Sequence, residues 1–320
     1  MLSHGLKTRG ILGLKINKID FMKTLNIIGK RKIWFVLAIL ITGACIGSLA
    51  IWQLNFGLDF TGGSLMEISF DGDRPAISEV KRVAGEQGIT EAIIQEIGDN
   101  GVALRFKVVN EDDHQKLLSA LKDQFGAITE GKFDSVGPVI GKELQKKSFT
   151  ALILVLIGIA AYVAFAFRKV SYPVESWKYG VITLISLAHD VLLPIGVFAV
   201  LGKFLNVEVG SAFVAAVLTV LGYSVNDTIV VFDRVRENLL RKNGDEEFED
   251  LVNRSVNETM ARSINTTLTT LLALIAVFFF GGESLKMFAL ALIIGVAAGA
   301  YSSIFIANPL LVTWYKYGQK

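Results

Sequence analysis

The chain has 320 residues, of which 52% are hydrophobic and 19% are charged, and its formal net charge is +2. Soluble domains are about 45–50% apolar and about one quarter charged, so this composition, gathered into long apolar runs, indicates an integral membrane protein. A net charge so near zero gives no indication of nucleic-acid binding. The single cysteine, Cys45, excludes a disulfide framework or a cysteine-based metal site.

Six apolar runs are long enough to cross a membrane, because a hydrocarbon core of ~30 Å needs ~20 apolar residues in a helix. The predicted spans are residues 33–52, 149–167, 179–201, 207–232, 264–280 and 285–314. The first span follows a 32-residue segment and is longer than the apolar part of a signal peptide. We therefore expect a retained helix rather than a cleaved leader.

Lysine and arginine residues set the predicted orientation, because short cytoplasmic loops carry an excess of them. They gather in the N-terminal segment 1–32, between the second and third spans, in the loop 233–262 and in the tail 315–320, whereas the opposite short loops hold only Lys203 and Lys286. Both termini are therefore predicted to be cytoplasmic. The five spans after the first form a bundle over residues 148–314.

The segment 53–147 has the composition of a water-soluble domain and is predicted to lie outside the cytoplasm. Residues 64–70 alternate apolar and polar side chains as a half-buried strand does, and residues 76–89 place apolar side chains on one helical stripe. A hairpin, a second amphipathic helix and a last strand follow. This β-α-β-β-α-β order predicts a ferredoxin-like α+β fold. Its histidine, His114, lies in a charged helix and is expected to be solvent-exposed.

Two acidic residues lie inside predicted spans: Asp190, beside His189 at the middle of the third, and Asp227, after Asn226 toward the cytoplasmic side of the fourth. A charge at the centre of a membrane helix costs about 2.5–3.5 kcal/mol on insertion scales. Such residues face a bundle interior or a wet cavity. Tyr223 is one helical turn before Asp227, which favours a polar rather than a lipid-facing stripe.

A polar face in the fifth span accompanies Asp227. It repeats at steps of three and four residues and comprises Arg262, Asn265, Thr266, Thr269 and Thr270. Arg262 is expected at a depth comparable with that of Asp227. We predict that the two form an ion pair, and that opening this pair would favour protonation of the carboxylate. Packing alone is the alternative role for the hydroxyl residues, which routinely bond between membrane helices.

Two further segments have structural interpretations. Loop 233–262 has helical spacing interrupted at Asn243 and Gly244, which predicts an amphipathic hairpin lying along the membrane surface. In the sixth span, Gly295, Gly299 and Ser303 form a small-xxx-small row, which predicts a close contact between helices.

Several segments together resemble the SecF family of the resistance-nodulation-division superfamily. They are FGLDFTGG after the first span, VGPVIGKEL before the second, AHDV in the third, GYSVNDTIVVFDRVREN in the fourth and ETMARSINTTLTTLL leading into the fifth. The similarity extends over residues 34–311. Within FGLDFTGG, the residues Asp59, Phe60, Thr61, Gly62 and Gly63 form a junction motif between the first span and the first strand.

The resemblance implies a subunit of the bacterial Sec protein-export machinery in the cytoplasmic (inner) membrane. Its partners would be SecD, the SecYEG channel, the translocating preprotein and membrane lipid. The family uses the proton motive force, or sodium in some members, to promote preprotein translocation. By position, Asp227 matches the family's intramembrane acidic site, Arg262 its basic site and Asp190 a further acidic position. No enzymatic activity, cofactor or metal is expected.

The sequence leaves three other functions to weigh. A scaffold subunit could stabilise SecD without conducting ions. An intramembrane aspartyl protease would also need two carboxylates on neighbouring helices, but no GxGD surrounds Asp190 or Asp227, and the chain has NPLL where a PAL signature is expected. A small-molecule efflux protein of the same superfamily would need more outer domain than this chain provides.

Overall fold

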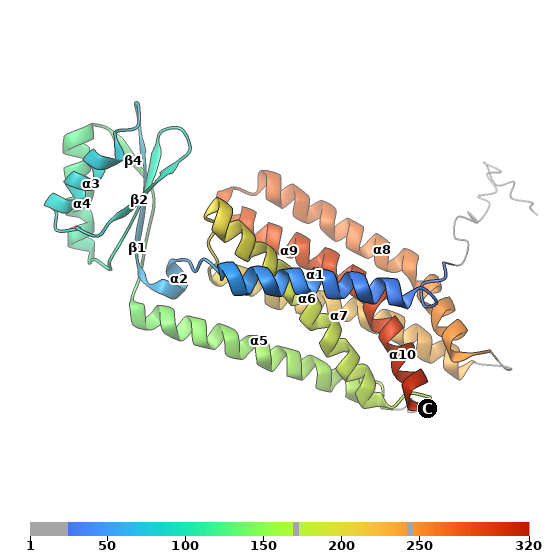
Figure 1. The fold of residues 1–320 in the computed structure, drawn as a ribbon. Helices are drawn as coiled ribbons and strands as arrows, with labels where there is room; N and C mark the ends of the chain where they lie inside the picture. The colour runs from blue at the N-terminus through green and yellow to red at the C-terminus, as the bar shows by residue number, and fades with distance from the viewer. Residues whose placement is uncertain (1–24, 169–172, 242–245, 320) are drawn as a thin grey trace, which may run out of the picture.

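The computed structural model describes residues 25–168, 173–241 and 246–319. It shows a bundle of long helices and a small α+β domain at one end of that bundle (Figure 1). The predicted N-terminal segment up to residue 24 and the predicted break at Asn243 and Gly244 lie outside the described residues.

Six helical segments are long and apolar enough to cross a membrane, among the residues that the structure describes. They are α1 (Arg31–Trp52), α5 (Pro138–Ala166), α6 (Ser176–Leu205), α7 (Ser211–Leu240), α8 (Phe248–Phe280) and a final segment of α9 (Glu283–Ser302), η1 (Ser303–Ala307) and α10 (Asn308–Gly318). The six predicted spans are therefore confirmed. The chain is a multi-pass membrane protein.

The helices differ in how much of their surface the chain itself covers. About half of the apolar window is buried in α6 (50%) and in the final segment (61%), but only 6% in α5 and 11% in α1 and α8. The bundle core is consequently built around α6, α7 and α9. The side faces of α1, α5 and α8 remain available to lipid or to another membrane subunit.

Helices α7 and α8 extend well past the ends of their predicted spans. The sequence predicted a surface hairpin over 233–262, but residues 233–240 continue α7 and residues 248–262 belong to α8. Val235, Leu251 and Val256 explain the difference, because all three are fully buried in the bundle's apolar core. These turns continue the helices rather than lying flat.

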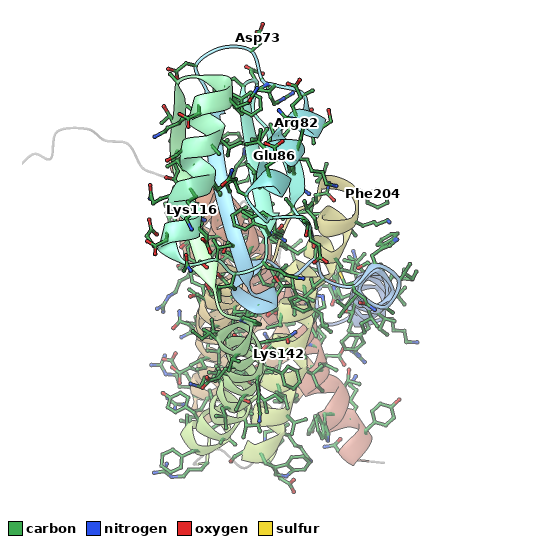
Figure 2. The ribbon with its side chains drawn as sticks, turned by 90° about the vertical axis from the view of Figure 1, so that its left-hand side faces the viewer. Asp73, Arg82, Glu86, Lys116, Lys142 and Phe204 are labelled. Carbon is green, nitrogen blue, oxygen red and sulfur yellow. The ribbon has the colours of Figure 1, made fainter. Side chains whose placement is uncertain are left out.

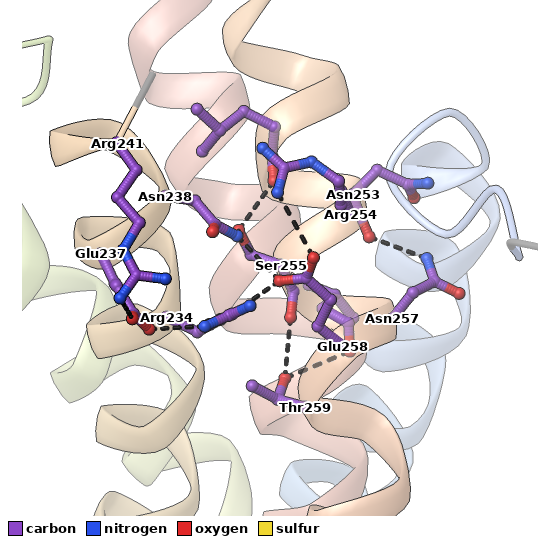
Figure 3. Close-up of polar contacts among 12 residues, drawn as sticks. Arg234, Glu237, Asn238, Arg241, Asn253, Arg254, Ser255, Asn257, Glu258 and Thr259 are labelled. Carbon is purple, nitrogen blue, oxygen red and sulfur yellow. Dashed lines mark hydrogen bonds and ion pairs between the residues drawn. The ribbon is translucent and has the colours of Figure 1, made fainter. Parts of the chain in front are cut away.

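A polar network holds the two extensions together (Figure 3). The Glu258 carboxylate accepts hydrogen bonds from Arg234 Nε at 2.6 Å, from Asn238 Nδ2 at 2.9 Å and from Arg254 at 3.3 Å. Asn238 also donates to Ser255 Oγ at 2.9 Å. Because it joins α7 to α8 at the end of the bundle away from the sheet, this network fixes the spacing of the two helices there.

The α+β domain has the predicted element order. It contains β1 (Gly63–Phe70), α3 (Ile77–Glu86), β2 (Ile93–Ile97), β3 (Gly101–Phe106), α4 (Glu111–Phe125) and β4 (Ile128–Val136). The strands pair antiparallel in the order β2-β3-β1-β4, and α3 and α4 cover one face of the sheet (Figures 1 and 2). This order confirms the ferredoxin-like prediction.

The prediction for His114 is wrong. Its side chain is buried, with Nε2 lying 2.7 Å from Glu130 Oε1 and the ring stacked on Phe133 at 3.7 Å between centroids. Leu117, Leu118 and Leu121 follow it on the same helical stripe and face the domain core. The spacing of α4 therefore carries His114 inward despite its charged neighbours.

Candidate functional site: buried carboxylates in the bundle

Asp190 occupies the centre of the bundle. Its side chain is completely buried on α6. Oδ2 accepts hydrogen bonds from Ser224 Oγ of α7 at 2.5 Å and from Ser302 Oγ of α9 at 2.7 Å. Oδ1 lies 3.0 Å from Nδ1 of the neighbouring His189, which is also buried. One carboxylate thus joins three helices through polar contacts.

Asp227 lies three residues after Ser224 on α7 and is also buried. Its Oδ2 accepts a hydrogen bond from Ser303 Oγ at 3.1 Å. Ser303 begins η1, a single widened helical turn, and Asn308 Nδ2 donates to the Ser303 carbonyl at 2.6 Å. Pro309 follows and lacks the N–H that a regular helix would use, which favours this widened turn. Such turns occur frequently at functional sites.

The two carboxylates belong to one cluster because consecutive serines bind them. Ser302 donates to Asp190 and Ser303 donates to Asp227. Ser302 was missed in the sequence, where the signal was a pair of adjacent hydroxyl residues inside an apolar helix. Each buried carboxylate carries a large desolvation penalty in its charged form. The cluster supplies hydroxyl donors but no described lysine or arginine within ion-pairing distance of either carboxylate.

The predicted ion pair between Asp227 and Arg262 does not form. Among the described residues, no ion pair or hydrogen bond joins the two side chains, and Arg262 is exposed on α8 whereas Asp227 is buried. The inward face of α8 instead carries Ser263 and Thr267. The sequence predicted how far along the membrane normal Arg262 lies, but it did not predict how α8 is rotated about its own axis. That rotation turns Arg262 away from Asp227.

The other predicted polar residues lie on an outward face of α7 and α8. Asn226, Arg262, Asn265, Thr266 and Thr269 are exposed. Tyr223 is half-buried and donates from Oη to Thr270 Oγ1 at 3.2 Å, which joins the two helices. The threonine hydroxyls bond to carbonyls of their own helix. We call this set, with Arg262 at one end, the outward polar face.

The junction motif lies between the two parts of the molecule. It forms a short helix, α2 (Leu58–Thr61), followed by two glycines with positive φ, 72° at Gly62 and 121° at Gly63. A Cβ at Gly62 would lie 2.7 Å from Pro138 Cα, and one at Gly63 would lie 2.9 Å from the Phe106 carbonyl oxygen. Only glycine fits both positions, because other residues would be strained as well as blocked.

Asp59 and Phe60 attach this motif to the bundle. Phe60 is buried among the apolar residues of α6 and α7. Asp59 Oδ2 accepts from the backbone N–H of Ser211 at 2.6 Å and from its Oγ at 2.5 Å. Thr61 Oγ1 donates to the Gly57 carbonyl at 3.0 Å. A carboxylate on the first N–H of α7 satisfies a free donor and complements the helix dipole.

We expect Asp59→Ala to lower the free energy of unfolding of the full chain by about 1 kcal/mol, because it removes a cap of α7. Unfolding by heat or denaturant in detergent measures this loss. Asp73→Ala is the matched control, since Asp73 is exposed in the loop after β1 (Figure 2). Equal stability of the two variants would contradict the capping role.

Two family models and several curated proteins are similar to this chain over most of its length. Residues 116–317 match the family model "Protein export membrane protein SecD/SecF, C-terminal", and residues 47–73 match the "SecD/SecF GG Motif". The protein translocase subunit SecF of Thermobaculum terrenum is 43% identical over 303 residues, covering 91% of this chain and 94% of that protein. The chain belongs to the SecF family. The SecF of Anaerolinea thermophila is 39% identical over 297 residues, with the same coverage.

A solved structure of a SecF relative has the same fold. The crystal structure of SecDF, a translocon-associated membrane protein from Thermus thermophilus, is similar with a TM-score of 0.77 and 32% identity. The match covers 91% of this chain and 39% of the SecDF chain. This SecF-family chain therefore corresponds to about two fifths of that longer protein. Its role is that of a subunit in Sec protein export.

Proposed function

We propose that this chain acts with SecD and the SecYEG channel to promote preprotein translocation, driven by the proton or sodium motive force across the bacterial cytoplasmic membrane. Both termini would be cytoplasmic and the α+β domain would lie outside. The observation that carries the proposal is the cluster of two buried carboxylates, Asp190 and Asp227, bound by serines from neighbouring helices. Burying two ionisable groups in a membrane costs free energy that helix packing by itself does not require.

The contacts of the cluster suit an exchangeable charge at Asp227. Asp190 has hydroxyl donors from two other helices, whereas one described side chain, Ser303, donates to Asp227. The smaller set of hydroxyl donors leaves more acceptor sites of the Asp227 carboxylate open to an incoming proton or cation. Ser303 lies on the widened turn η1, so a shift of this helix would move the hydroxyl donor of the Asp227 carboxylate. Asp227 is the proposed ion-exchange residue, and Asp190 holds the three helices around it.

The outward polar face supports a partner subunit in the membrane. Asn226, Arg262 and Asn265 are exposed on the chain's own surface, and a charged guanidinium facing lipid costs several kcal/mol. Among the described residues no side chain pairs with Arg262. SecD is the proposed partner for this face. It would complete the ion path by placing polar groups against Arg262. The potential across the cytoplasmic membrane would drive the ion along this path.

A scaffold that only stabilises SecD is the second candidate, favoured by the dense hydrogen bonding of Asp190, which is a packing arrangement. Ion flux through liposomes containing this chain and SecD separates the two. If Asp227 exchanges ions, we expect an ion flux that rises when preprotein moves through SecYEG in the same vesicles. An ion flux equal to that of liposomes lacking this chain would contradict ion conduction and support the scaffold function.

A further inference from the structure

An apolar groove runs along α5 at the end of the bundle next to the α+β domain. It has a volume of about 440 Å³, within the range typical of small-molecule sites. Phe56 and Phe60 of the junction line one end, Phe149 and Leu152 of α5 line one side, and Phe213 and Val214 of α7 line the other. The groove exists because α5 diverges from the rest of the bundle (Figure 1).

Two lysines at the rim give the groove a charge. Lys142 and Lys146 both line it, one helical turn apart on α5, and both are exposed. Among the described residues neither forms an ion pair, whereas the adjacent Lys147 binds Glu143 at 2.8 Å. None of the described residues that line the groove is acidic. Figure 2 shows Lys142 at the start of α5, directly beneath the α+β domain.

The groove spans the boundary between the headgroups and the acyl chains of one leaflet. It follows α5 from Lys142 to Leu152, which is about 15 Å of helix at 1.5 Å per residue. Residues 142–148 precede the apolar run of α5, and residues 149–152 lie within it. The apolar run of α5 begins just below the lysines, at Phe149, so their ammonium groups lie at the level of lipid phosphates while the walls lie at the level of acyl chains.

We propose that this groove binds one anionic phospholipid of the leaflet on the side of the α+β domain. One of its two acyl chains lies between α5 and α7, and the phosphate lies against Lys142 and Lys146. The charge decides the occupant, because an apolar helix of a partner subunit would leave Lys142 and Lys146 without counter-charge. A lipid phosphate whose headgroup carries no compensating positive charge satisfies the lysines, and its acyl chains satisfy the apolar walls.

Native mass spectrometry of the full chain in detergent, titrated with phosphatidylglycerol or phosphatidylcholine, tests this proposal. We expect one retained phosphatidylglycerol. The double variant Lys142→Gln/Lys146→Gln should bind it about thirtyfold more weakly, from roughly fivefold for each lysine near an anionic lipid. The matched control Lys122→Gln/Lys203→Gln removes two charges from exposed lysines elsewhere and should stay within about twofold of the wild type.

A second variant separates the groove from the charge. Val214→Trp fills the groove without changing any charge and should also abolish retention. Phosphatidylcholine retained as well as phosphatidylglycerol, or unchanged affinity in the double lysine variant, would overturn the proposal. Displacement of phosphatidylglycerol when the SecD subunit is added would overturn it as well, because the groove would then belong to the subunit interface. The lysine variants alter only exposed side chains, so their loss of binding does not arise from unfolding.

Discussion

Asp227→Asn is expected to abolish the stimulation of protein export by the ion motive force while assembly with SecD continues. Asparagine has nearly the same shape and still offers Ser303 Oγ an acceptor, so the packing of α7 against η1 is preserved. It cannot bind and release a proton or balance a cation. One charge crossing 100 mV supplies about 2.3 kcal/mol, which corresponds to about a fiftyfold bias between two conformations. That bias is what the variant should lose.

Preprotein translocation into membrane vesicles, with and without an ionophore that collapses the gradient, measures this effect. The wild type should lose its stimulation when the ionophore is added, and Asp227→Asn should behave like the wild type with ionophore from the start. Asp233→Asn is the control on the same helix, since Asp233 is more exposed and pairs with Arg236 at 2.5 Å. Full stimulation by Asp227→Asn would refute the role of this carboxylate.

Asp190→Asn gives a different pattern if the two carboxylates have separate roles. Asp190 accepts from Ser224 and Ser302 on one oxygen and lies beside His189 on the other. An amide retains part of this network but presents a donor where an acceptor is needed. The proposed division of roles therefore places the main effect of Asp190→Asn on stability, and that of Asp227→Asn on the response to the gradient.

Sequence patterns predicted the membrane spans and the sheet topology because both depend on periodicity along one element. Apolar length located all six spans, and alternation with turn residues located β1 to β4. The row of Gly295, Gly299 and Ser303 also predicted a close helix contact, which α9 makes with α7. These features require no knowledge of how distant elements are turned toward each other.

The site was predicted in part. Asp190 and Asp227 stood out by the cost of burying charge, but their partners depend on helix rotation, which the residue order does not contain. Arg262 was predicted to face Asp227, but it is exposed on the outward side of α8. His114 was misjudged for a different reason: its charged neighbours were given more weight than its register with Leu117 and Leu121, which would have shown that it faces inward.

Gly299→Ala is expected to lower the free energy of unfolding of the chain by about 1–3 kcal/mol, as overpacking of a tight contact does. A Cβ at Gly299 would lie 2.8 Å from Ser224 Cβ and 3.2 Å from its Cα. Ser224 cannot rotate away without giving up its hydrogen bond to Asp190. The helices must therefore separate, or the Asp190 carboxylate must lose a donor.

Thermal unfolding of the full chain in detergent checks this expectation, with Gly158→Ala on α5 as the control. A Cβ at Gly158 meets no atom within 4 Å, so alanine should leave stability unchanged or raise it by up to ~1 kcal/mol through helix propensity. A double-mutant cycle with Ser224→Ala, which removes the Oγ atom but keeps the Cβ, distinguishes the two costs. If Gly299→Ala lowers stability as much in the Ser224→Ala background as in the wild type, the loss arises from helix separation. If it lowers stability little in that background, the loss arises from displacement of the Ser224 hydroxyl from Asp190, so the contact at Gly299 would act by positioning the carboxylate cluster.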